Sequence, residues 1–392
     1  MRTFEKTHPW LTFSANLAEA SPRLWIMLGE CQSKCEHVAK APLRPATARE
    51  LYKVYLAKGA RATTAIEGNT LSEEEVREHL DGALELPPSR KYLEQEVANV
   101  IAACNALWEA MAQGEPAPIS LDGIRALNRT VLAGLELDED VVPGELRSHS
   151  VVVGRYRGAP AEDCEFLLGK LADWLNGEQF EPVEGLDIAY AIIKAVLAHL
   201  YLAWIHPFGD GNGRTARLLE FQILLAAGVP TASAHLLSNH YNLTKTEYYR
   251  QLDTASTSGG DVLPFVSYAV RGLLDGLAQQ LDAIWQQQWD VTWRNYVHEF
   301  FRDKTSASQV RRRRLVLDLS RRAETVPAED IPDISTRLAR AYTARTEKTL
   351  ARDLNALVEA GLLERAGKGY RARKELILAF LPKRAHAGRA EE

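Results

Sequence analysis

From His206 to Arg217 the chain reads His-Pro-Phe-Gly-Asp-Gly-Asn-Gly-Arg-Thr-Ala-Arg, between two segments with helical apolar spacing. Glycines let consecutive backbone N–H groups converge on an anion. The N-terminus of the helix that follows adds the positive end of its dipole. The stretch therefore predicts a phosphate-binding loop at a helix–loop–helix junction.

The charged side chains of this stretch fit phosphate chemistry. Arg214 and Arg217 lie on one face of the first helical turn, where guanidinium groups can hold phosphate oxygens through paired hydrogen bonds. Asp210 is placed to hold a hard cation such as Mg²⁺, which takes one or two carboxylates plus phosphate oxygens. His206 is placed to deprotonate an attacking hydroxyl. Each residue alone is more often structural, and it is their concentration in one short stretch that indicates a site.

The stretch is neither a Walker loop nor a dinucleotide-binding fingerprint. It resembles the signature of Fic-domain proteins, His-Pro-Phe-x-Asp-Gly-Asn-Gly-Arg-x-x-Arg, at every defined position. That resemblance implies a mainly helical core that transfers AMP from ATP to a serine, threonine or tyrosine hydroxyl of a target protein. Related Doc-type kinases carry lysine where this chain has Gly213, so the resemblance implies transfer of a nucleotidyl group.

The resemblance also assigns roles to individual residues. His206 is expected to be the general base on the target hydroxyl, Asp210 to bind Mg²⁺ and Arg217 to meet the γ-phosphate. The residues expected to surround the nucleotide phosphates are Gly211, Asn212, Gly213 and Arg214.

A second segment, Thr63-Thr64-Ala65-Ile66-Glu67-Gly68, resembles the inhibitory motif Ser/Thr-x-x-x-Glu-Gly/Asn of many Fic proteins. In those proteins the glutamate pairs with the second arginine of the signature, which is Arg217 here. A carboxylate would then occupy the guanidinium fork that a phosphate needs. Alone, the pattern is equally typical of a helix end at Gly68 with a solvated Glu67.

A β-hairpin is expected between Ser148 and Pro160, where Val151-Val152-Val153 precedes two glycines. It resembles the flap of Fic proteins, which pairs with the backbone of the target, and an ordinary structural hairpin fits the pattern as well.

The rest of the chain reads as mainly α. Apolar spacing, capping residues and Gly or Pro breaks predict helices over 46–65, from 72 onward, and over 92–111, 120–132, 164–175, 186–205, 214–227, 245–254 and 263–301. Residues 186–205 are nearly all apolar but contain Asp187, Lys194 and His199, so we expect a buried central helix and no membrane span.

The C-terminal region has a different character, with 19 Lys and Arg against 12 Asp and Glu from Thr305 onward. Helices are expected over 315–323, 334–342 and 346–359, followed by a turn at Gly367-Lys368-Gly369. This order resembles a winged helix-turn-helix domain, which implies DNA contacts through Arg345, Lys348 and Arg352. A solvated charged face, a dimerisation surface or a protein-docking surface remain open.

These expectations divide the chain into four parts: an N-terminal helical region with the inhibitory helix (1–109), the Fic core (110–275), a connecting helix (276–304) and a winged-helix domain (305–392). The fold class is mainly α, with a small β-hairpin. A homodimer is expected from the resemblance alone.

Composition limits the class of protein. The 392 residues are 46% hydrophobic and 25% charged with a net charge of −5, which is typical of a globular protein. Four cysteines are too few for a disulfide scaffold, and the first residues lack the apolar core of a signal peptide, so we expect a cytoplasmic protein.

The sequence thus favours a protein adenylyltransferase that uses ATP and Mg²⁺ and is autoinhibited by Glu67. Removal of AMP from a modified protein, a nucleotide-sensing DNA-binding regulator and a different nucleotide donor remain as alternatives.

Overall fold

The structure is a computed structural model that describes residues 2–114, 119–343 and 345–378. It divides into two compact units, Met1–Ile284 and Trp285–Glu392. The larger unit carries the His206–Arg217 stretch, and the smaller unit carries the basic C-terminal region. Each unit has its own buried apolar cluster.

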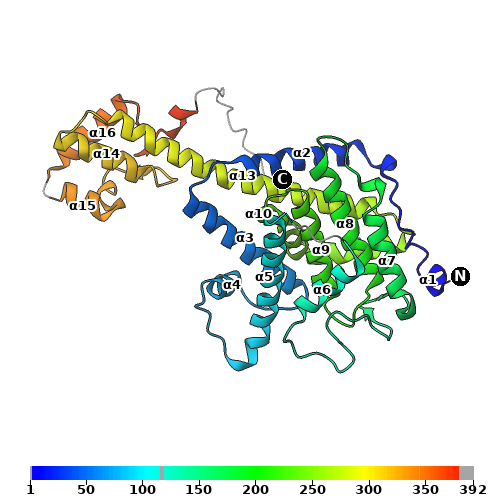
Figure 1. The fold of residues 1–392 in the computed structure, drawn as a ribbon. Helices are drawn as coiled ribbons and strands as arrows, with labels where there is room; N and C mark the ends of the chain where they lie inside the picture. Colours follow the sequence, from blue (N-terminus) through cyan, green and yellow to red (C-terminus); the bar gives the residue numbers. More distant parts are fainter. Residues whose placement is uncertain (1, 115–118, 344, 379–392) are drawn as a thin grey trace. The chain divides into compact units, whose positions relative to one another are not determined.

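The larger unit is helical apart from one short hairpin (Figure 1). Its helices are α1 (Thr3–Thr7), α2 (Pro22–Lys40), α3 (Pro45–Ile66), α4 (Glu73–Leu80), α5 (Lys91–Ala112), α6 (Leu121–Val131), α7 (Cys164–Leu175), α8 (Asp187–Ile205), α9 (Asn212–Ala226), α10 (Thr231–Ala234), α11 (Leu236–Leu243), α12 (Lys245–Thr257) and the first part of α13 (Leu263–Phe300). The mainly α prediction is confirmed, and the helices foreseen in this unit lie within a few residues of their observed ends.

Helices α8 and α9 pack against each other at the centre of this unit (Figure 1). Helix α2 and helix α7 cover α8, while α3, α5 and α6 cover α9. Among the described helices, α8 alone is long and apolar enough to cross a membrane, but 83% of its apolar window is buried in the protein. Its hydropathy is therefore that of a central core helix.

Local signals explain where several helices begin and end. The Ser72 hydroxyl accepts a hydrogen bond from the Glu75 N–H, and the Glu75 carboxylate accepts one from the Ser72 N–H, which is the predicted capping box of α4. Helix α2 was not predicted, although Ser21 caps it by accepting from the Leu24 N–H and Pro22 occupies its first turn.

The hairpin consists of β1 (Val152–Val153) and β2 (Tyr156–Arg157), paired antiparallel with Val153 opposite Tyr156. Val152 and Val153 are both exposed on this short edge. A separate β-bridge joins Leu146 to Phe208, so the chain just before the hairpin lies alongside the loop between α8 and α9.

The smaller unit combines the end of α13 with α14 (Ala307–Leu319), α15 (Thr336–Tyr342), α16 (Glu347–Glu359) and a three-stranded antiparallel sheet. The sheet has the order β3–β5–β4, with β3 (Val326–Pro327), β5 (Gly369–Ala372) and β4 (Leu363–Ala366). The helices predicted over 334–342 and 346–359 are observed with small shifts.

The helix predicted over 315–323 is wrong in its bounds. Ser306 caps α14, so the helix starts at Ala307, before the basic run, and ends at Leu319. Arg311 and Arg312 point into the unit and pair with the buried carboxylate of Asp353, at 2.6 and 2.8 Å. Part of the basic run is therefore internal charge, which sequence periodicity does not reveal.

Candidate active site

The loop between α8 and α9 is held in one conformation by its own side chains. Helix α8 ends at His206, which adopts the left-handed conformation with φ 50° and ψ 58°. The Asn212 side chain closes the loop on itself, because its amide oxygen accepts from the Phe208 N–H at 2.9 Å and its amide nitrogen donates to the Phe208 carbonyl at 2.8 Å. Gly211 has φ 76° at the start of α9, a conformation that favours glycine.

His206 points its imidazole into this loop region. Its Nδ1 lies 3.3 Å from the Ala203 carbonyl, a contact in which Nδ1–H donates, leaving Nε2 with a free lone pair. Burial, and to a smaller extent the positive charge of Arg147, lower the pKa of His206 below its ordinary value, against the opposing effects of the Ala203 carbonyl, Glu67 and Asp210. The imidazole is therefore neutral at pH 7, as a general base must be.

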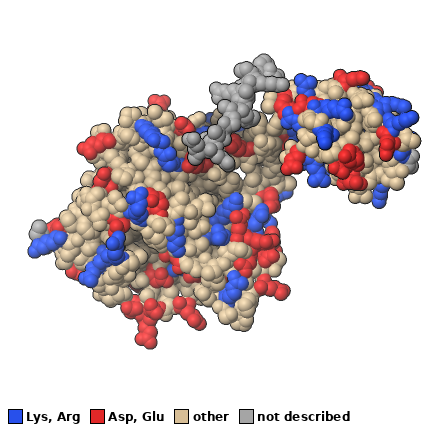
Figure 2. Space-filling model, turned by 180° about the vertical axis from the view of Figure 1, so that it is seen from behind, with Lys and Arg blue, Asp and Glu red and all other residues tan. Residues whose placement is uncertain are grey.

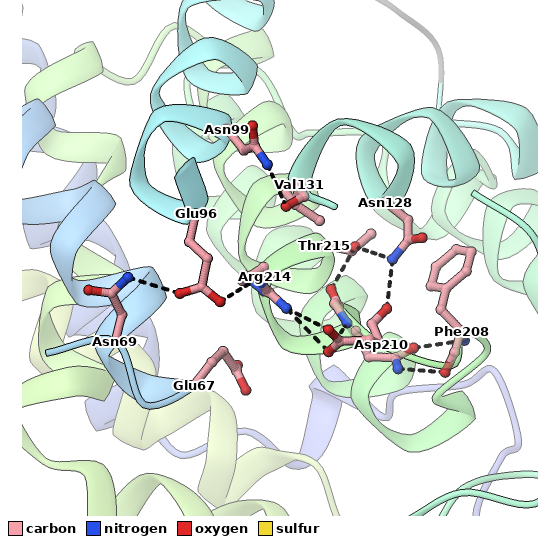
Figure 3. A network of polar contacts seen from close by, with 12 residues as sticks. Glu67, Asn69, Glu96, Asn99, Asn128, Val131, Phe208, Asp210, Arg214 and Thr215 are labelled. Atoms are coloured by element: carbon pink, nitrogen blue, oxygen red, sulfur yellow. Dashed lines mark hydrogen bonds and ion pairs between the residues drawn. The ribbon is translucent and has the colours of Figure 1, made fainter. Parts of the chain in front are cut away.

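Arg214 lies between two carboxylates (Figure 3). Its guanidinium donates to both carboxylate oxygens of Asp210, at 3.2 and 3.1 Å, and to Glu96 of α5 at 3.3 Å. The other oxygen of Glu96 accepts from the Asn69 amide at 2.8 Å. Arg214 is thus buried and fixed, with its Nε unpaired.

Arg217 is occupied by the end of α3. Its guanidinium donates to the Glu67 carboxylate at 2.5 Å and to the Thr63 carbonyl at 2.9 Å. Desolvation opposes ionisation of Glu67, but the charges of Arg217 and Arg214 prevail and hold its pKa below the ordinary range. The pair that the inhibitory motif implies is therefore present, as an ion pair whose arginine is 1% and whose glutamate is 33% exposed.

Because Gly213 has no side chain, the Glu67 carboxylate can lie against it. A Cβ on Gly213 would come within 2.1 Å of the Glu67 Oε1 atom. The end of α3 is held from α12 as well, since the Tyr249 hydroxyl and the Lys245 ammonium each lie 3.4 Å from a carbonyl of its last turn. The Glu67 carboxylate thus lies beside Gly213 in the first turn of α9 and is paired with Arg217.

Most of these groups, but not Arg214, face one cavity of about 740 Å³, a size typical of a small-molecule site. The loop and the start of α9 form one wall, the β1–β2 hairpin a second, and Tyr248 and Tyr249 of α12 a third. His206, Asp210, Gly211, Asn212, Gly213 and Arg217 all line it, as does Glu67.

The comparisons with known proteins fit this geometry. The family described as Fic/DOC matches residues 118–224, a range that includes α8, the loop and α9. The chain contains a Fic domain. Over 223 residues it is 34% identical to "Protein adenylyltransferase fic-1" of Caenorhabditis elegans, a match that covers 57% of this chain and 40% of the relative. It is 32% identical over 209 residues to "Protein adenylyltransferase Fic" of Nematostella vectensis, covering 53% and 45%.

Solved structures support the fold of the Fic domain. The Fic-1 fragment of C. elegans is 28% identical, with a TM-score of 0.55 over 68% of this chain and 74% of that one. A Fic family protein from Desulfovibrio desulfuricans G20 has a TM-score of 0.55 over 90% and 96% of the two chains, and at 22% identity it speaks for the fold alone. The chain spans less than half the length of these curated relatives.

Of the predicted residues of the Fic domain, Arg214 alone does not line the cavity, because its guanidinium is buried and paired with Asp210 and Glu96. The possible DNA contacts Arg345, Lys348 and Arg352 belong to the smaller unit, where all three are exposed on or just before α16. The functional roles of the individual residues stay predictions. The four-part division of the chain and its cytoplasmic location also stay predictions.

Sequence reasoning missed the residues that support the site from elsewhere in the chain. Asn128 of α6 is fully buried and donates to the Asp210 carbonyl at 2.9 Å and the Thr215 hydroxyl at 3.3 Å (Figure 3). Glu96 likewise accepts a hydrogen bond from Arg214, and Arg147 donates one to the His206 carbonyl. No local motif marks these three residues, because each acts through a long-range contact.

Proposed function

We propose that this chain is a protein adenylyltransferase that transfers AMP from ATP to a hydroxyl side chain of a target protein, and that Glu67 restrains it. The observation that carries the proposal is the cavity in which His206, the N-terminus of α9 and Arg217 converge. The names of the relatives, all of them protein adenylyltransferases, support the same reaction.

In this reaction the target hydroxyl oxygen forms a bond to the α-phosphorus of ATP, and the bond between the α-phosphorus and the bridging oxygen breaks. Pyrophosphate leaves with the bonding electrons. His206 Nε2 takes the hydroxyl proton, which the tautomer favoured by the Ala203 contact allows. The N–H groups at the start of α9 and the side chain of Arg217 neutralise charge on the phosphates, while Arg214 holds the Asp210 carboxylate in place.

Mg²⁺ fits the donor set as an ion shared with ATP. The Asp210 carboxylate is about half exposed and faces the cavity. The described residues contain no cluster of three or more His, Cys, Asp or Glu side chains that would hold a metal alone, so the remaining ligands would be phosphate oxygens and water. Bound there, Mg²⁺ would neutralise phosphate charge.

Glu67 supplies the restraint, because a γ-phosphate and the Glu67 carboxylate need the same guanidinium. Removing that carboxylate should therefore raise AMP transfer, while removing the base should abolish it. The test follows label into protein with Mg²⁺ and ATP labelled separately on the α- and γ-phosphates, in the wild type, Glu67→Gly and His206→Ala.

Label from the α-phosphate alone, strongest in Glu67→Gly and absent in His206→Ala, is the expected result. Unchanged labelling in His206→Ala would overturn the mechanism. No α-label in any form would turn attention to removal of AMP from a modified protein or to another donor. Glu94→Gln is a matched control, since Glu94 pairs with His79 away from the cavity.

For the smaller unit we propose a winged-helix domain that binds DNA through phosphates. Its order of helices and its β3–β5–β4 sheet support this proposal. Arg345, Lys348 and Arg352 are exposed, and none of them forms an ion pair within the described chain. Figure 2 shows many Lys and Arg side chains on this unit, interspersed with Asp and Glu.

The test compares DNA binding by the full chain and by a variant with alanine at Arg345, Lys348 and Arg352 over a salt series. The slope of log K against log salt should lose about 0.9 for each phosphate contact removed. Equal slopes would refute the DNA role of these residues. The homodimer implied by the family resemblance stays a prediction, which light scattering of the full chain would test.

A further inference from the structure

We propose that Arg147 is the positioning residue of the general base, fixing the backbone of His206 in its left-handed conformation through hydrogen bonds to the surrounding carbonyls. This inference rests on the proposed function, because it gives His206 its catalytic role. Arg147 lies between α6 and the hairpin, far from His206 in sequence, and it belongs to no motif that the sequence analysis used.

The contacts of Arg147 converge on the end of α8. Its Nε donates to the His206 carbonyl at 2.7 Å, and one Nη donates to the Ala159 carbonyl and lies 3.5 Å from the Ile205 carbonyl. The other Nη donates to the His149 carbonyl at 2.5 Å. The side chain is 4% exposed, so it is a buried cation whose described guanidinium hydrogen bonds all go to backbone oxygens.

Backbone contacts hold residues 146 and 147 beside the loop between α8 and α9. The Arg147 N–H donates to the Pro207 carbonyl at 3.0 Å, next to the bridge between Leu146 and Phe208. Gly158 permits the close packing, because a Cβ there would lie 2.9 Å from the His206 Cβ and 3.0 Å from an Arg147 Nη. His206 is thus enclosed by the chain on either side of the hairpin.

These contacts explain why His206 keeps a positive φ. His206 is one of two non-glycine residues with positive φ in the described chain, and a residue with a Cβ keeps that conformation only where its surroundings impose it. The conformation turns the chain from α8 into the loop while the imidazole stays against the Ala203 carbonyl. Without Arg147, the His206 carbonyl loses its donor, whereas the Ile205 carbonyl still accepts from the Ala159 N–H at 3.1 Å.

The positive charge of Arg147 also favours the neutral imidazole that a general base needs. The charged groups that act on His206 are Arg147, which favours the neutral imidazole, and Glu67 and Asp210, which favour the protonated form, while the Ala203 carbonyl accepts from Nδ1. A lysine at position 147 keeps the charge but cannot reproduce the fork of donors. A glutamine removes the charge and keeps two donors.

The experiment places Arg147→Lys and Arg147→Gln in the Glu67→Gly chain. Both should lower kcat for AMP transfer by about 10- to 100-fold, because the base is misplaced, while ATP affinity stays unchanged. Arg125→Lys is the matched control, since Arg125 donates to the Gly144 carbonyl and pairs with Glu145 but does not contact His206. Melting curves establish that each variant is folded at the assay temperature.

A second readout does not depend on activity. Nitrogen-15 NMR of the histidine rings, with His206 assigned by its loss in His206→Ala, should show a higher pKa for His206 in Arg147→Gln than in Arg147→Lys. Unchanged kcat in both folded variants, or an unchanged His206 titration in Arg147→Gln, would overturn the inference. If the Glu67→Gly parent transfers no AMP, the proposed function fails, and the titration alone decides whether Arg147 positions His206.

Discussion

Adding a single methyl group at Gly213 should release Arg217 from Glu67. The new Cβ would lie 2.1 Å from the Glu67 Oε1 atom, so the carboxylate, at the end of a flexible side chain, must leave. Gly213 lies in the first turn of α9, where alanine is a better helix former than glycine by about 1 kcal/mol. The fold should therefore tolerate Gly213→Ala.

The size of the release follows from the contact that is lost. A hydrogen bond between charged groups contributes about 1.5–3 kcal/mol, and the exposure of one third of Glu67 reduces this to about 1–2 kcal/mol. At about 1.4 kcal/mol per factor of ten, the fraction of molecules with a free Arg217 rises roughly 5- to 30-fold. AMP transfer at limiting ATP should increase in that proportion, less any cost of the methyl group near the phosphates.

A double-mutant cycle separates the two effects. Initial rates of α-label transfer are measured for the wild type, Gly213→Ala, Glu67→Gly and the double variant. The difference between Glu67→Gly and the double variant gives the cost of the methyl group once Glu67 is absent. If Gly213→Ala activates the chain to the same extent with and without Glu67, the steric reasoning is refuted.

Three further predictions concern protonation and stability. Burial lowers the pKa of His206, so the acid limb of the pH profile of kcat/KM should lie below pH 6.5. In Glu67→Gly the limb should move to still lower pH, because a carboxylate that favours the protonated imidazole is gone. An acid limb above pH 6.5 would contradict this prediction. Without ligand, Glu67→Gly should melt at a lower temperature than the wild type, because Arg217 loses its counter-ion. ATP at 100 times its Kd should raise the free energy of unfolding by about 3 kcal/mol. Equal melting temperatures without ligand would count against the buried ion pair. Asp353→Ala should lower the free energy of unfolding of the smaller unit by about 3 kcal/mol, measured by calorimetry. The reason is that three side chains donate to this buried carboxylate, those of Arg311, Arg312 and Tyr342. The control Glu299→Ala removes an exposed ion pair and should have almost no effect.

Local chemistry made the loop and most helices of the larger unit predictable. The glycines and polar residues between His206 and Arg217 admit few structures other than an anion-binding turn, and capping residues such as Ser72 mark helix starts directly. The pairing of Glu67 with Arg217 needed more than local chemistry. It followed from the family resemblance, because nothing in Thr-x-x-x-Glu-Gly itself states which partner the glutamate meets.

Residues that act across long sequence distances were not predictable. Arg147 and Glu96 look like ordinary surface charges in the sequence. The fold buries Arg147 and partly buries Glu96, whose helix α5 packs against α9. The start of α14 was missed for a related reason. Its arginines give no apolar periodicity, since two of them are turned inward to Asp353.

The inhibitory contact and the proposed substrate share one electrostatic requirement. Arg217 is a cation that the fold buries almost completely, and a buried cation is costly unless an anion pairs with it. In the structure that anion is the Glu67 carboxylate, and in the proposed reaction it is a phosphate oxygen. A change at Arg217 would therefore remove inhibition and phosphate binding together and could not separate them. Changes at Glu67 and Gly213 alter only the competing anion, and for that reason they distinguish a restrained enzyme from one that never binds nucleotide.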